Sequence, residues 1–89
     1  MGLFIENLKR SVAGAIENGA QYFGVIVYNG LNDQSEIIIN TVHNMTTGKL
    51  DYYLNAYNDK LELKTQPKIR ITGITYGNSF EDIQKDLGY

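Results

Sequence analysis

The first hydrophobic pattern in the chain has the period of an α-helix. Six apolar side chains between residues 4 and 16 fall within a sector of about 120° on a helical wheel, and Glu6, Arg10 and Glu17 lie on the opposite side. Asn18-Gly19 follows, and glycine is a common helix stop because it readily adopts the left-handed conformation of a C-terminal cap. The pattern therefore predicts an amphipathic helix that ends near residue 18.

The next segment, residues 21–29, is rich in aromatic and β-branched residues and predicts a strand. Both alternating sets of its side chains are apolar, which is typical of a strand covered on both faces. Turn residues at 30–33 precede a second apolar segment at 35–42, so the two segments predict a β-hairpin.

Helical spacing returns in residues 47–58, where Thr46 or Thr47 is the expected N-cap. Leucines alternate with charged residues at 61–64 and predict a short edge strand, which Gln66-Pro67 is expected to end. Residues 68–76 predict a longer strand, with Ile69 and Ile71 on one face. Arg70, Thr72, Ile74 and Tyr76 are then expected on the other face, the face that Tyr22 and Tyr28 would share. A last helix is expected from Phe80 to Leu87, capped by Asn78 and stopped by Gly88.

These elements predict a single compact α+β domain spanning residues 1–89, in the order α-β-β-α-(β)-β-α. We expect three or four mostly antiparallel strands with the helices packed on one face of the sheet. One helical layer leaves an apolar sheet face uncovered. The pattern therefore predicts that Phe23, Val25 and Val27, or the tyrosine face behind them, meet a partner such as a second copy of the chain.

Composition narrows the function classes. The chain has no Cys, which excludes disulfides and thiolate metal sites, and no apolar run reaches the 18 residues of a membrane span. Charged residues near the N-terminus argue against a signal peptide, so we expect a cytoplasmic protein. The net charge is −2, and Asp59 and Glu62 interrupt the one basic cluster, Lys60, Lys64, Lys68 and Arg70. Nucleic-acid binding is therefore not favoured.

Two features raise the question of catalysis or ligand binding. His43 is the single histidine, with no sequence signal for a nucleophile or a metal cluster beside it, so we expect no metal, no cofactor and no enzymatic activity. Gly77-Asn78-Ser79 joins a strand to a helix N-terminus, where free N–H groups favour an anion. An oligomeric protein that binds a nucleotide-like anion there is the alternative hypothesis, although a turn and a cap explain the same residues.

The favoured hypothesis is a non-enzymatic protein that binds another protein. Tyr52 points away from the predicted apolar face of its helix, beside Lys49 and Asn55, and exposed tyrosines are frequent in binding hot spots. The frequent use of Asn, Ile, Tyr and Lys beside only two Arg indicates an AT-rich genome. Small proteins of this kind are common in phages and mobile elements, which suggests an inhibitor of host defence machinery.

Overall fold

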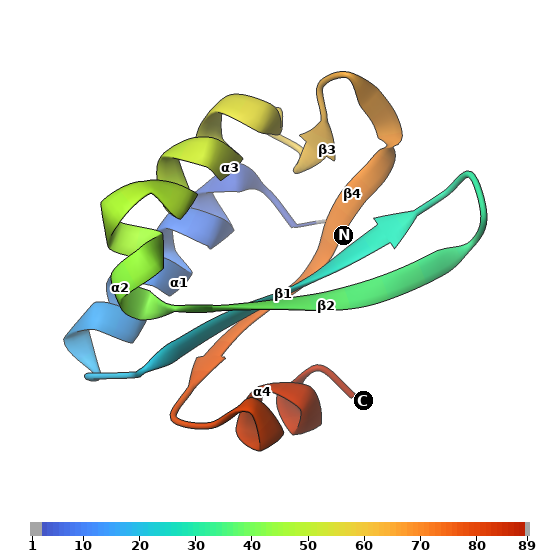
Figure 1. The fold of residues 1–89 in the computed structure, drawn as a ribbon. Helices are drawn as coiled ribbons and strands as arrows, with labels where there is room; N and C mark the ends of the chain where they lie inside the picture. The colour runs from blue at the N-terminus through green and yellow to red at the C-terminus, as the bar shows by residue number, and fades with distance from the viewer. Residues whose placement is uncertain (1–2, 89) are drawn as a thin grey trace.

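The computed structural model describes residues 3–88 and contains a four-stranded antiparallel sheet in the order β2-β1-β4-β3 (Figure 1). The strands are β1 (Tyr22–Asn29), β2 (Gln34–Thr41), β3 (Glu62–Leu63) and β4 (Gln66–Gly77). The helices are α1 (Ile5–Glu17), α2 (Val42–Asn44), the π-helical η1 (Met45–Lys49), α3 (Leu50–Ala56) and α4 (Phe80–Asp86). The predicted α+β class is confirmed, and the order of elements is roughly compatible with the prediction.

The helical segment after β2 begins earlier than predicted. The Thr41 hydroxyl accepts a hydrogen bond from the Asn44 N–H at 3.0 Å, which caps α2 directly at the end of the strand. The hydroxyls of Thr46 and Thr47 instead donate to the His43 carbonyl at 2.9 and 3.0 Å, inside the helical segment. A first helical turn capped by Thr41 therefore precedes the predicted start at residue 47, and a kink at Gly48 separates this turn from α3.

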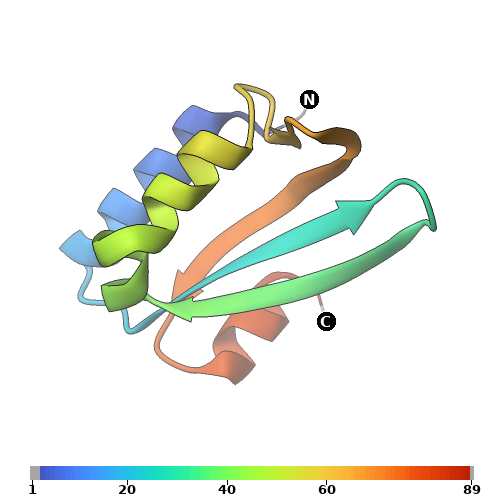
Figure 2. The ribbon, with the colours of Figure 1, turned by 45° about the horizontal axis from the view of Figure 1, so that its top comes forward.

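Two helical layers sandwich the sheet. Helix α1 and the segment from α2 to α3 pack on one face, and α4 lies on the opposite face (Figures 1 and 2). The main core lies under α1 and α3 and contains Phe23 and Val25 of β1. Gly24, which alternation directs to the other face, lies against Ile83 and Leu87 of the α4 segment. The prediction that all helices share one face is therefore corrected for α4.

This arrangement removes the reason for expecting a partner on a sheet face. Phe23 and Val25 are each 1% exposed beneath the helices of their own chain, and Val27 packs against the same core. Behind them, α4 covers Gly24 through Ile83, which is fully buried. The chain therefore covers the centre of β1 on both faces by itself.

A β-bulge in β4 changes which of its residues face the core. Val27 pairs with Ile71 and Ile26 pairs with Gly73, so the register shifts and the intervening Thr72 has no partner on β1. After the bulge, Ile74 pairs with Val25 on the core face. Tyr76 lies on that face as well, where its hydroxyl accepts a hydrogen bond from the Asn18 side chain at 3.1 Å. The expected tyrosine face of Tyr22, Tyr28 and Tyr76 does not exist.

Candidate functional site

The predicted binding residues lie together on the outward side of the second helical segment, where Lys49 ends η1 and Tyr52 and Asn55 belong to α3. Their spacing of three residues places them along one side of a helix, and all three are exposed. Tyr52 is 52% exposed, one of five large hydrophobic side chains of residues 3–88 with this degree of exposure. We call Lys49, Tyr52 and Asn55 the α3 patch.

The ring of Tyr52 is held from two sides. The Lys49 ammonium lies 5.2 Å from the ring centroid, a cation–π geometry that contributes about 0.5 kcal/mol at an exposed site. The ring of Tyr53 meets it edge-on, with centroids 5.4 Å apart. Asn55 donates from its side chain to the Asp51 carbonyl at 2.9 Å, which orients its amide on the helix. The exposed aromatic group of the α3 patch is therefore restrained before any partner binds.

Tyr53 anchors this arrangement in the core. It is 3% exposed, and its ring lies 5.9 Å from that of Tyr57, which is also buried. Burial is the main cause that raises the pKa of Tyr53 from 10.0 to about 12, and the neighbouring Tyr57 and Tyr52 add to it. Burial also raises the pKa of Tyr57. The folded protein therefore favours the protonated form of both hydroxyls.

We expect stability to fall in alkaline solution because of Tyr53. The folded state holds this proton more tightly than the unfolded chain, so the contribution is complete below pH 10 and is lost as the pH rises towards 12. The loss amounts to about 2 kcal/mol. Urea unfolding between pH 8 and 11.5 measures it. Tyr53→Phe should reduce the decrease and leave the smaller part due to Tyr57, whereas equal decreases in both proteins would contradict the assignment.

The turn at Gly77-Asn78-Ser79 is built as a helix cap. The Ser79 hydroxyl accepts a hydrogen bond from the Asp82 N–H at 3.1 Å, so Ser79 is the cap and not Asn78 as predicted. Glu81 and Asp82 occupy the first turn of α4, where their carboxylates already complement the helix dipole and repel a second anion. This geometry favours the structural interpretation of the turn over the anion site.

His43 lies exposed on α2, and its backbone carbonyl receives the two threonine hydroxyls described above. No group of three or more His, Cys, Asp or Glu residues within residues 3–88 is arranged to hold a metal ion.

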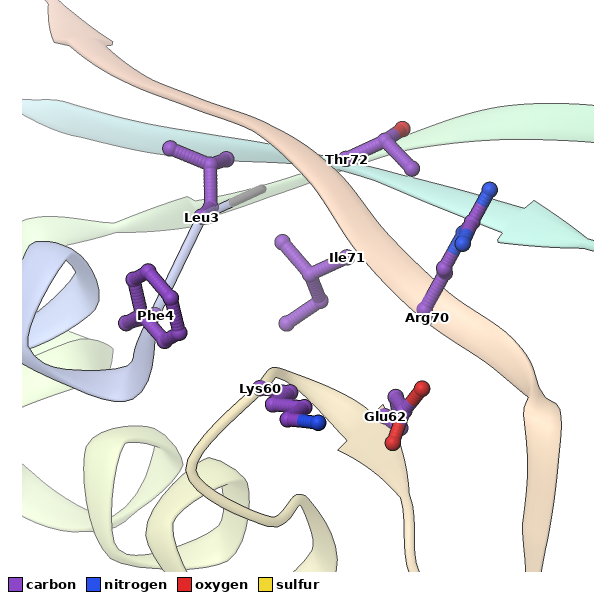
Figure 3. Close-up of a pocket in the computed structure, with 7 residues that line it drawn as sticks. All are labelled: Leu3, Phe4, Lys60, Glu62, Arg70, Ile71 and Thr72. Carbon is purple, nitrogen blue, oxygen red and sulfur yellow. The ribbon is translucent and has the colours of Figure 1, made fainter. Parts of the chain in front are cut away.

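One pocket of the described chain was not predicted from the sequence. It has a volume of about 430 Å³ and lies where the start of α1 meets β3 and β4 (Figure 3). The Ile5 N–H donates to the Asp59 carbonyl at 2.8 Å and holds these segments together. The pocket is lined by Leu3, Phe4, Lys60, Glu62, Arg70, Ile71 and Thr72. The pocket has an apolar floor and charges of both signs at its rim. Such a pocket favours the binding of an apolar side chain of another molecule over the binding of an anion.

Part of this pocket had a signal in the sequence. Lys60 and Arg70 belong to the basic cluster that the sequence shows between residues 60 and 70, and Glu62 is one of the acidic residues that interrupt it. No sequence pattern indicated the apolar floor of the pocket, because Leu3 and Ile71 are brought together only by the tertiary fold.

No helix within residues 3–88 is both long and apolar enough to cross a membrane. Comparison of the chain with protein-family models, with curated proteins and with solved structures finds no match.

Proposed function

We propose that the protein acts as a non-enzymatic binding protein and that the α3 patch contacts another protein. The restrained ring of Tyr52 is the observation that carries the proposal. Tyrosine is enriched in hot spots because it contributes a large contact area with few rotatable bonds. A ring already held by Lys49 and Tyr53 loses less conformational entropy on binding than a free one.

The chemistry of the patch defines the kind of partner. Lys49 supplies a positive charge, Tyr52 supplies an aromatic surface and Asn55 supplies an amide. A partner surface with an apolar pocket bordered by carboxylates would match this set. The narrower hypothesis, a phage or mobile-element inhibitor of host defence in the cytoplasm, is supported by amino-acid usage alone and stays a prediction.

Removal of the Tyr52 ring should abolish most of the binding. We expect Tyr52→Ala to weaken the complex more than tenfold while the melting temperature falls only slightly, because the half-exposed ring loses only its contacts with Lys49 and Tyr53. Tyr52→Phe keeps the ring and should bind nearly as well. Leu31→Ala is the matched control, since Leu31 is a similarly exposed apolar residue (58%) in the β1–β2 turn.

The partner can be trapped before its identity is known. A photoreactive phenylalanine at position 52, expressed in the source cells, should crosslink one protein in high yield, and the same group at position 31 should not. Titration of the purified partner with the variants then gives the affinities. Equal affinity of the wild-type protein and Tyr52→Ala would overturn the proposed role of the α3 patch.

A further inference from the structure

Strand β2 forms one edge of the sheet. It pairs with β1 on one side, and no other strand within residues 3–88 pairs with its other side. The strand is eight residues long, pairs with β1 without a register shift, and carries Glu36 as its single charge. Proline, lysine and bulges, the usual protections of an edge strand, are missing from β2.

Hydrogen bonding to β1 determines which backbone groups of β2 point outward. The Val42 N–H donates to the Gln21 carbonyl at 2.9 Å, so these residues form a hydrogen-bonded pair in the register of the two strands. In an antiparallel ladder such pairs alternate with pairs whose backbone groups point away. The even-numbered residues of β2 therefore face β1. The outward N–H and C=O groups belong to Ser35, Ile37, Ile39 and Thr41.

We propose that two copies of the chain pair antiparallel through β2, with Ile38 opposite Ile38 of the second copy. In this register Ile37 faces Ile39 of the second copy, and Ser35 faces Thr41. All outward residues then form hydrogen-bonded pairs, four pairs of two bonds each, or about eight hydrogen bonds. A shift of the register by two residues in either direction leaves an outward residue at one end of each β2 without a strand partner.

The side chains fit the same register. Glu36 lies opposite Asn40 of the second copy, so the two carboxylates do not face each other. Ile37 and Ile39 form two cross-strand pairs on the face that carries α4, and the two Ile38 side chains meet on the core face. The symmetry is two-fold and closes the assembly as a dimer with one eight-stranded sheet. The opposite edge ends in the two-residue β3, which offers little for further pairing.

The mass of the full chain in solution tests the pairing. Analytical ultracentrifugation from 1 to 300 µM should show conversion from 10.0 kDa to twice that mass as the concentration rises. A monomer throughout this range would overturn the proposal and leave β2 available to a strand of another protein. The outcome is independent of the α3 patch, because Tyr52→Ala should dimerise like the wild-type protein.

The register has its own test at position 40. Asn40→Glu puts a second carboxylate opposite Glu36 of the other copy, twice in the dimer, and Asn40→Lys puts an opposite charge there. Both variants place a charge at the same half-buried position of the monomer. Their melting temperatures show how much stability each substitution removes from the monomer itself. The dissociation constant of the Asn40→Glu dimer should exceed that of Asn40→Lys by at least about tenfold. Equal constants would overturn the proposed register.

Hydrogen exchange of the wild-type protein provides a readout without any substitution. The amides of Ile37 and Ile39 should exchange slowly in the dimer and rapidly after dilution to the monomer, whereas the Ile38 amide should be protected in both states. Rapid exchange of Ile37 and Ile39 in a protein that sediments as a dimer would place the interface elsewhere.

Discussion

We expect the substitution Gly24→Val to detach α4 from the sheet and to lower the free energy of unfolding by about 3 kcal/mol. Gly24 is buried in the middle of the sheet, and a Cβ atom at this position would overlap the Ile83 side chain. Ile83 is fully buried and is the main contact through which α4 is held. Both Ile83 and the backbone of β1 would have to move, and each is fixed by its neighbours.

Urea unfolding measures the loss of stability. Faster protease cleavage on the C-terminal side of residue 79 would show that α4 has been released from the sheet. In an Ile83→Ala background, Gly24→Val should cost at least about 1 kcal/mol less, since the overlapping atoms are gone. Equal costs in the two backgrounds would show that α4 does not occupy the space above Gly24.

Gly24 also explains why the position of α4 was not predicted. Periodicity identified the apolar side of the last helix but not the sheet face that it covers. The information lay in the strands, since Gly24, Gly73 and Gly77 all meet the α4 segment where a Cβ atom would be crowded. Isolated glycines in strands indicate a close approach of another element, and three glycines on one face of a sheet indicate that a helix packs closely there.

The bulge in β4 shows how one residue changes a face prediction. Alternation placed Ile71 and Ile74 on opposite faces, whereas the unpaired Thr72 beside Gly73 brings them to the same face. A single inserted residue inverts every side chain beyond it, so an error at one position moved Tyr76 to the wrong side of the sheet.

The α3 patch was predictable because it depends on local helix geometry. Three residues at intervals of three share a side whether or not the rest of the fold is known. The pocket at Leu3 and Ile71 and the edge position of β2 depend instead on which segments become neighbours. The isoleucines at 37–39 indicate a strand in an apolar environment, but strand order alone makes β2 an edge.

Leu61 should be among the most sensitive positions of the core. Its side chain is fully buried, its N–H donates to the Asn58 carbonyl and its carbonyl accepts from the Ile71 N–H, both at 2.9 Å. Its φ of 59° lies in the left-handed region, which is unfavourable for a leucine. We expect Leu61→Ala to lower the free energy of unfolding by about 3 kcal/mol, because it leaves a cavity in the main core without relieving the backbone.

Leu61→Gly separates the two contributions. Glycine removes one more carbon from the core than alanine, and at an ordinary backbone position it would be the less stable variant. At a φ of 59° glycine is free of the steric penalty that alanine retains, so we expect Leu61→Gly to be more stable than Leu61→Ala by about 0.5 kcal/mol. Urea unfolding of both variants decides it. A more stable alanine variant would mean that the backbone relaxes once the leucine is gone. The expected order would mean that the left-handed turn persists and keeps Lys60 and Glu62 at the rim of the pocket.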